Sequence, residues 1–345
     1  MAAALQHPIA SPDRATTSRA GTAGLPRIRA NHGEYVDQTA VGWMRPTPND
    51  LPLEEMRSRF REDGYLWVKG LIPREDVLDM REHYFHHLLD TNILEPGTSP
   101  RNGIFNHSED PLNHGGVGGS DLPSEQLKVT RLVTAHTMPE YLHFLEHPSL
   151  RSFIRRFMSW EREVIVRRAM LRHNVPEGLS TGIHYDKIFL RAGEAEFLTS
   201  WIPIGDCAAN GGGLIYMEDS ARLGRAIEAD FTKRANEKSF TEEERTNAFN
   251  VHMNRSGQLA DDAEQFAQDM HARFGGAGGK RPRWLMADYE AGDVVFHDPY
   301  MIHGAGRNED KEGRIRLSCD LRFYEAGAAC DERWMKKHWS PDDGL

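Results

Sequence analysis

A histidine and an aspartate stand two residues apart in the segment 181–186, Thr-Gly-Ile-His-Tyr-Asp, which is rich in strand-forming residues. Alternate side chains of a strand share one face, so His184 and Asp186 are expected to point the same way and Tyr185 the opposite way. One imidazole and one carboxylate supply two thirds of a 2-His-1-carboxylate site. Such a site binds non-haem Fe(II) and leaves positions open for a co-substrate and O2. Because so short a motif is common by chance, the hypothesis needs a third ligand and an anchor for a co-substrate.

A later region of the chain supplies candidates for both. The segment 292–297, Gly-Asp-Val-Val-Phe-His, is typical of a turn and a strand, and Ile-His303-Gly-Ala-Gly follows it. Arg314 stands eleven residues after His303. Iron with three protein ligands needs a bidentate co-substrate, and 2-oxoglutarate offers a 2-oxo acid group for that purpose. Its remote carboxylate then needs a planar, two-pronged cation, which arginine provides better than lysine.

Two of these assignments have rivals in the same region. His297 also ends a predicted strand and competes with His303 as the second histidine. Arg316 has the same strand parity as Arg314, so periodicity does not separate them, and Ser318 lies on the same face.

The elements that must position these residues are mostly short strands. From residue 164 onward, strand-like runs alternate with turn residues, a pattern typical of an antiparallel sandwich or barrel. The predicted fold class is therefore mainly β with flanking helices (α+β). The predicted strands cover 164–171, 183–190, 198–204, 213–217, 284–287, 293–297 and 315–324.

Helices are predicted ahead of these strands. Helical spacing of apolar residues indicates helices over 51–62 and 74–89, with a short buried strand at 65–69 between them. A third apolar stripe predicts a helix over 139–158.

The domain organisation follows from where such patterns begin and end. Residues 1–45 show no hydrophobic period and are predicted to be a disordered tail rather than a transit peptide. A single domain is expected over 46–330, and a C-terminal tail over 331–345. The charged, helix-like block at 222–279 reads as an insertion that serves as a lid, a dimer contact or decoration. The polar loop at 91–124 is either a substrate cover or a connector.

Two other histidine groups have weaker claims to a metal. His143-Phe-Leu-Glu-His147 spells the H-x-x-E-H zinc signature, but Pro148 follows at once, so a structural turn is favoured. The helix cluster of His83, His86 and His87 lacks a carboxylate in register and is interpreted as a solvated face.

Composition excludes several classes of partner. A formal net charge of −10 argues against nucleic acid. No apolar run is long enough for a membrane span, for which about 18 residues are needed. The cysteines Cys207, Cys319 and Cys330 show no CxxC spacing, so neither a zinc knot nor a disulfide scaffold is expected. A cytoplasmic protein acting on a small molecule, in monomeric or homodimeric form, fits these features.

The order of the motifs resembles that of the phytanoyl-CoA dioxygenase family, Fe(II)- and 2-oxoglutarate-dependent oxygenases on a double-stranded β-helix (jelly-roll) core. The similarity runs from about Phe60 to Tyr324. It is carried by the segment 60–71, Phe-Arg-Glu-Asp-Gly-Tyr-Leu-Trp-Val-Lys-Gly-Leu; by His184-Tyr-Asp186; by Trp201-Ile-Pro-Ile with Asn210-Gly-Gly-Gly-Leu214; and by 292–297 with Ile302-His303-Gly-Ala-Gly and Arg314.

The resemblance implies roles for individual residues. His184, Asp186 and His303 would ligate iron, and Arg314, at the family's eleven-residue step from His303, would bind the remote carboxylate of 2-oxoglutarate. His297 would then pack or hydrogen-bond beside the metal. The resemblance places Trp201 against the co-substrate and two further co-substrate contacts near Met170 and Arg131, while Ser318 could assist the arginine.

The implied activity is that of a dioxygenase that consumes 2-oxoglutarate and O2, forms succinate and CO2, and oxidises a substrate C–H bond. Hydroxylation is the leading expectation, and desaturation or ring formation lies within the same chemistry. Related halogenases replace the carboxylate ligand with a small residue, so the presence of Asp186 disfavours halogenation. The alternatives are a non-catalytic jelly-roll binding module and a redox-neutral Zn or Mn enzyme.

The substrate is less well defined. The family usually reads Pro-Gly-Ser-His after its Asn-Gly segment, whereas this chain has Met217-Glu-Asp-Ser-Ala221, so the family's substrate preference does not carry over. An acyl-CoA needs cations for its phosphates, and no dense basic run lies near the predicted strand ends. A small metabolite, such as a natural-product intermediate or an amino acid, is favoured over an acyl-CoA.

Overall fold

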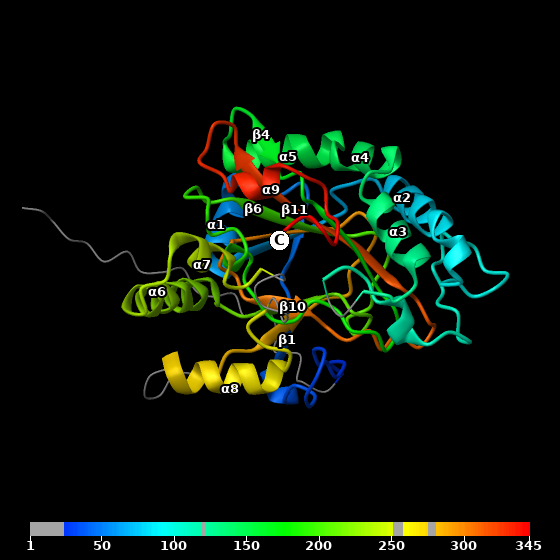
Figure 1. Cartoon of the computed structure of the whole chain (residues 1–345), viewed down its shortest axis with the longest axis horizontal. Helices are drawn as coiled ribbons and strands as arrows, with labels where there is room; N and C mark the ends of the chain where they lie inside the picture. Colours follow the sequence, from blue (N-terminus) through cyan, green and yellow to red (C-terminus); the bar gives the residue numbers. More distant parts are fainter. Residues whose placement is uncertain (1–23, 119–121, 251–257, 275–280) are drawn as a thin grey trace, which may run out of the picture.

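The computed structural model describes residues 24–118, 122–250, 258–274 and 281–345. Two β-sheets form its centre; α4 (Pro139–Leu145) and α5 (Pro148–Met158) lie above them in Figure 1 and α8 (Ala263–Phe274) lies below. The larger sheet has the order β2 (Pro46–Pro48), β3 (Tyr65–Lys69), β9 (Val294–His297), β6 (Leu198–Pro203), β11 (Arg316–Glu325) and β4 (Glu163–Ile165), and β5 (Met170–Asn174) also pairs with β11. The smaller sheet has the order β1 (Val41–Trp43), β8 (Trp284–Met286), β7 (Leu214–Met217) and β10 (His303–Ala305). This is the predicted jelly-roll core with flanking helices.

Strand β11 shows how the sequence separates the two faces of the larger sheet. Its odd-numbered side chains, from Leu317 to Phe323, are apolar and pack into the core beneath the helices. Its even-numbered side chains from Arg316 to Arg322 are polar, buried and turned to the other face, toward the interior of the jelly roll. They are Arg316, Ser318, Asp320 and Arg322.

The helices cover the outer face of the larger sheet much as predicted. α1 (Leu53–Asp63) ends at Gly64, whose φ of 74° is the left-handed conformation that favours glycine. α2 (Arg74–His87) follows β3. The helix predicted over 139–158 is two helices, because Pro148 starts α5 and cannot continue α4.

The H-x-x-E-H motif falls at this break and forms a turn. His147 accepts a hydrogen bond from the backbone N–H of Ser149, at 3.3 Å, and thereby caps α5. Its other ring nitrogen is 3.1 Å from Asp76. The turn reading of this motif is thus the one that the structure favours over a zinc site.

The packed part of the chain starts about twenty residues earlier than predicted. From Leu25 onward, the predicted tail covers the smaller sheet with the short helix η1 (Gln38–Ala40) and strand β1, which pairs in parallel with β8. Its apolar residues are too widely spaced to produce a period, yet several of them are buried. Residues 1–23 of the predicted tail lie outside the described residues.

The predicted insertion is helical and packs on the smaller sheet. It contains α6 (Ala221–Glu237), α7 (Glu242–Asn247) and α8. Phe266 of α8 and Ile227 of α6 share a buried cluster with Trp284 of the sheet, so the block is not surface decoration. Its segments 251–257 and 275–280 lie outside the described residues.

The loop predicted at 91–124 and the C-terminal tail both lie against the jelly roll. The loop contains η2 (Leu89–Thr91) at its start and η3 (Pro111–His114), and α3 (Gln126–Ala135) follows it. Its carbonyl at His114 accepts a hydrogen bond from His173 of β5, at 3.0 Å. The tail forms α9 (Glu332–Met335), and its Trp339 packs with Met170 and Leu132. Residues 119–121 of the loop are not described.

Among the helices of the described residues, none is both long and apolar enough to cross a membrane. The three cysteines carry free thiols.

Candidate metal centre

Three side chains that could hold a metal converge at one end of the jelly roll. Each of His184, Asp186 and His303 offers one ligand atom, and these atoms lie within 4.8 Å of one another. All three residues are buried. Reciprocal backbone hydrogen bonds between His184 and His303, both 2.9 Å, join two segments that are more than a hundred residues apart in the sequence.

The predicted alternation holds only as far as Asp186. Tyr185 is extended, with φ −124° and ψ 146°, so its side chain leaves on the side opposite to the two ligands. The strand predicted over 183–190 is not formed: Ile183 and His184 make only isolated bridges, and at Asp186 the chain enters the short helix η4 (Asp186–Ile188). The ligand pair thus stands where extended chain gives way to a helical turn.

Backbone carbonyls set the orientation of both histidine rings. Nδ1 of His184 is 2.8 Å from the Gly182 oxygen, and Nδ1 of His303 is 2.8 Å from the Met301 oxygen. A carbonyl oxygen can only accept, so each Nδ1 carries the proton and each Nε2 keeps a lone pair for a metal. Burial, together with His184 and His297 nearby, holds the pKa of His303 well below its ordinary value, so its imidazole is neutral.

Asp186 is surrounded by hydrogen-bond donors. Oδ1 accepts from Nη2 of Arg322 at 2.7 Å, and Oδ2 accepts from Oγ1 of Thr199 at 2.5 Å. Nε2 of His297 is 3.2 Å from Oδ2. Burial opposes ionisation of this carboxyl, but the charge of Arg322 and the hydrogen bond from His297 outweigh it, so the pKa of Asp186 lies well below its usual value.

This donor set fits a divalent transition metal. A carboxylate and two neutral imidazoles are the ligands of a facial triad on non-haem Fe(II), and they leave other coordination positions open. His297 belongs to the support of the site: its Nδ1 is 3.1 Å from the Tyr216 hydroxyl while its Nε2 meets Asp186. That is the role beside the metal that was expected for His297 if His303 is the ligand.

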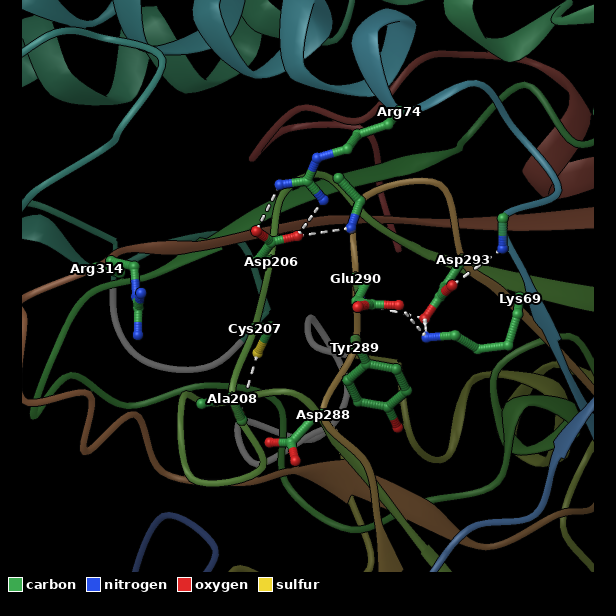
Figure 2. Close-up of a pocket in the computed structure, with 12 residues that line it drawn as sticks. Lys69, Arg74, Asp206, Cys207, Ala208, Asp288, Tyr289, Glu290, Asp293 and Arg314 are labelled. Atoms are coloured by element: carbon green, nitrogen blue, oxygen red, sulfur yellow. Dashed lines mark hydrogen bonds and ion pairs between the residues drawn. The ribbon is translucent and has the colours of Figure 1, made fainter.

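Arg314 does not join this cluster. Its side chain is 38% exposed and forms ion pairs with Asp310, at 2.9 Å, and Glu312, at 2.8 Å. It borders an open surface pocket of about 790 Å³, in which Figure 2 shows Asp206 turned toward Arg74.

That pocket lies at the opposite end of the larger sheet. β6 starts beside Asp186 with Thr199 and runs toward Asp206 in the pocket, and β11 runs the other way, from near Arg314 to Arg322. Six residues of strand at about 3.3 Å each, on the order of 20 Å, separate Arg322 from the start of β11 at Arg316, and Arg314 precedes that start by two residues.

Arg316, the rival to Arg314, points into the jelly roll. It is 4% exposed, and its guanidinium donates to Gly212 O at 2.8 Å, Ser318 Oγ at 2.8 Å and Ser180 Oγ at 2.7 Å. Among the described residues no carboxylate forms an ion pair with it. Burial lowers the pKa of Arg316 to about 10, so it keeps its charge at neutral pH. The hydrogen-bond partners of Arg316 are thus neutral oxygens.

Trp201 and Met170 both line the interior beside Asp320. In the register of β11, Asp320 is opposite Trp201 of β6 on one side and Met170 of β5 on the other. Trp201 packs on Tyr289, with ring centroids 4.7 Å apart. These two predicted contacts therefore stand on the same inner wall as the metal cluster.

Arg131 faces away from the interior. It lies on α3 and pairs with Asp90 at 2.5 Å, with a third of its side chain exposed. One turn earlier on the same helix, Lys128 is buried and its Nζ is 3.2 Å from Nε2 of His114. The structure thus turns Lys128 inward and Arg131 outward.

Several buried polar residues near the centre were not anticipated from the sequence. Arg322 and Thr199 bind Asp186 directly, and Arg172 of β5 forms an ion pair with Asp320 at 3.0 Å. One signal was available: β11 reads Arg-Leu-Ser-Cys-Asp-Leu-Arg, with a polar residue at every second position of a buried strand. A strand buried on both faces with such an alternation indicates a polar interior.

A family model places the chain among known proteins. The model of the phytanoyl-CoA dioxygenase (PhyH) family matches residues 60–315, about three quarters of the chain. The chain belongs to this family. The enzyme class and the cofactors predicted from the sequence are thereby confirmed: the protein is a 2-oxoglutarate-dependent non-haem iron dioxygenase.

Solved structures are similar to this chain at low sequence identity. The non-haem α-ketoglutarate-dependent carbocyclase SnoK of nogalamycin biosynthesis is 18% identical, with a TM-score of 0.50 over 87% of this chain and 92% of that one. The epimerase SnoN of the same pathway is 15% identical, with a TM-score of 0.46 over 79% and 83%. AviO1 from Streptomyces viridochromogenes Tue57 is 17% identical, with a TM-score of 0.43 over 81% and 97%. No match was found among curated protein sequences.

Proposed function

We propose that this PhyH-family protein hydroxylates a C–H bond of a small molecule, using Fe(II) held by His184, Asp186 and His303. The observation that carries the proposal is the convergence of these three buried ligand atoms within 4.8 Å at one end of the jelly roll. When bound, iron and 2-oxoglutarate supply the oxidising power: O2 cleaves the 2-oxo acid to succinate and CO2, and one oxygen atom goes to the substrate.

The protein's own part is to orient these groups and keep competing reactions out. The carbonyls at Gly182 and Met301 direct the two imidazole lone pairs to a common point. Arg322 and Thr199 fix the carboxylate of Asp186 so that it does not rotate away from that point. The buried side chains of Trp201 and Met170 exclude water from the inner face of the larger sheet, beside the metal ligands.

Arg316, assisted by Ser318, is our candidate for binding the remote carboxylate of 2-oxoglutarate. Its burial and its lack of an acidic partner among the described residues support this role, since a buried guanidinium favours an anion. The family's eleven-residue step favours Arg314, but that side chain is already paired with Asp310 and Glu312 at the far end of the sheet.

The charge of the interior also supports a dianionic co-substrate. Among the described residues, the buried Arg316 and Arg322 and the mostly buried Arg172 face two buried carboxylates there, Asp186 and Asp320. Added Fe(II) raises this excess of positive charge by two, and 2-oxoglutarate offsets that increase. Charges taken out of water need such compensation.

The substrate that we favour is a small metabolite, such as an intermediate of natural-product biosynthesis. The acidic net charge of −10 does not favour an acyl-CoA with its phosphates. The carbocyclase SnoK has the same fold. Ring formation is therefore a second outcome to be tested beside hydroxylation.

The test is an aerobic assay with Fe(II), 2-oxoglutarate and a panel of hydroxylatable metabolites, including a branched acyl-CoA. Mass spectrometry of the products distinguishes the outcomes, since hydroxylation adds one oxygen atom whereas ring formation or desaturation removes two hydrogens. The proposal predicts a product with added oxygen, matched by succinate and lost in His184→Ala. A product that has only lost hydrogens would contradict the hydroxylase assignment, and a product formed equally by His184→Ala would contradict the metal site.

A further inference from the structure

Helix α6 of the insertion contacts the first segment that carries metal ligands. The hydroxyl of Tyr185 donates a hydrogen bond of 2.6 Å to Oε2 of Glu228 on α6. Tyr185 is fully buried and stands between the ligands His184 and Asp186. The residue that separates the two ligands is therefore fixed at its far end by the insertion.

Glu228 is itself held rigidly. Nε and Nη2 of Arg191 donate to its two carboxylate oxygens at 2.7 and 2.8 Å, a bidentate pair. The Arg191 guanidinium lies over the ring of Phe231, also on α6, at 4.0 Å from the ring centroid. The acceptor for Tyr185 thus belongs to an ordered, largely buried network.

The same helix contacts the segment that leads to the third ligand. Arg225 donates to Asp298 at 2.8 Å and lies 4.1 Å above the ring of Tyr300. Gly224 lets α6 approach closely, because a Cβ there would lie 2.0 Å from the Tyr300 carbonyl oxygen. Tyr300 in turn stacks on Tyr185, with ring centroids 6.0 Å apart.

These contacts bear on the geometry of the ligands. In extended chain, a rotation of one residue turns its neighbours with it, because successive side chains alternate across the backbone. A fixed Tyr185 hydroxyl therefore fixes the direction in which His184 and Asp186 project. A metal site requires its ligand atoms at set distances, and groups that orient the ligands typically change metal affinity by about 10- to 100-fold.

We propose that Glu228 is a positioning residue for the metal centre, acting through the Tyr185 hydroxyl, and that α6 is a built-in support of the site rather than a lid. The inference rests on the proposed function, since it concerns the same metal. It gives the insertion a role that its sequence alone does not indicate.

The test uses two variants that remove the hydrogen bond from opposite sides. Tyr185→Phe keeps the ring and its stacking, and Glu228→Ala removes both acceptor oxygens. Glu237→Ala is the matched control, because Glu237 lies on the same helix with a 61% exposed side chain and forms an ion pair with Lys233, at 4.0 Å. Apo protein of each variant is titrated anaerobically with Co(II), and both the affinity and the ligand-field absorption spectrum are recorded. Thermal unfolding is measured in parallel.

The inference predicts that Tyr185→Phe and Glu228→Ala each bind Co(II) about 10- to 100-fold more weakly, with an altered spectrum. The double variant should be no weaker than the weaker single variant, because both changes remove one interaction. Glu237→Ala should match the wild type. Wild-type affinity and spectrum in both variants, whatever their melting temperatures, would overturn the inference. If wild-type protein itself binds no Co(II), the proposed function fails first, so the two failures are distinguishable.

Discussion

Arg322 and Asp186 form a fully buried ion pair in which Nη2 of the arginine lies 2.7 Å from Oδ1 of the proposed metal ligand. A carboxylate that binds metal at a buried position needs a cation for the metal-free state as well, and Arg322 is that cation. The pair therefore stabilises the folded jelly roll, and it also keeps the Asp186 carboxylate ionised and able to bind a metal.

Removing Arg322 should destabilise the apo protein. Arg322→Ala leaves Asp186 as a buried charge without its ion-pair partner, and breaking such a pair typically costs about 3–5 kcal/mol. We expect a loss of this size in the free energy of unfolding, measured by urea denaturation, with partial recovery in Arg322→Lys. An unchanged denaturation midpoint in Arg322→Ala would show that the pair contributes nothing.

Replacing Arg316 and replacing Arg314 should have different effects on the KM for 2-oxoglutarate. A hydrogen bond to a charged group is worth about 1.5–3 kcal/mol, which is roughly 10- to 150-fold in affinity. Arg316→Ala should therefore raise the KM for 2-oxoglutarate by about that factor, while Arg314→Ala, the matched control, stays near the wild type. The reverse result would restore the role that the family's spacing gives to Arg314.

Replacing His303 and replacing His297 should affect Fe(II) binding differently. His303→Ala removes a ligand and should abolish detectable Fe(II) binding. His297→Ala removes only a hydrogen-bond partner of Asp186, so Fe(II) binding should persist, about 10- to 100-fold weaker. Isothermal titration under nitrogen measures both variants. Equal loss in the two would mean that His297 also ligates the metal.

A buried histidine should make the protein less stable in mild acid. Burial lowers the pKa of His136 to about 4, and its ring is neutral in the fold: Nδ1 donates to Leu132 O at 2.8 Å and Nε2 accepts from Leu171 N at 3.0 Å. An unfolded histidine has a pKa of about 6.5, so the unfolded state binds more protons between the two values. Stability is thus fully present above about pH 6.5 and is lost as pH falls toward 4, on the order of 3 kcal/mol for this group.

Urea denaturation at several pH values between 7 and 5 checks this expectation. His136→Gln, which does not titrate, should show a shallower dependence of unfolding free energy on pH than the wild type. Identical slopes in the two proteins would mean that His136 is not the titrating group.

The sequence was informative where chemistry is local. His184 and Asp186 are neighbours on the same side of an extended residue, and the position of His303 followed from a motif of successive residues, so their convergence could be predicted. Most of the predicted strands also followed from the pattern, but the run at 164–171 is two strands, β4 and β5, and the run at 183–190 forms only isolated bridges ahead of η4.

The prediction was weaker where position depends on how the chain turns. Arg314 and Arg316 have the same parity, but β11 begins only at Arg316, and the side chain of Arg314 pairs instead with Asp310 and Glu312. Tyr185 and Glu228 are 43 residues apart, and no periodicity connects a strand residue to a helix in an insertion. The packing of residues 25–45 was missed because scattered apolar residues give no periodic signal.

The most direct test of the account is the release of CO2 from 2-oxoglutarate labelled at its first carbon. Apo protein is loaded anaerobically with Fe(II) and 2-oxoglutarate, and O2 is then admitted. The account predicts labelled CO2 and an equal amount of succinate from the wild type, and neither product when Fe(II) is omitted or when His184 is replaced by alanine. Release by the wild type no greater than that by His184→Ala would contradict the assignment of His184, Asp186 and His303 as an iron site.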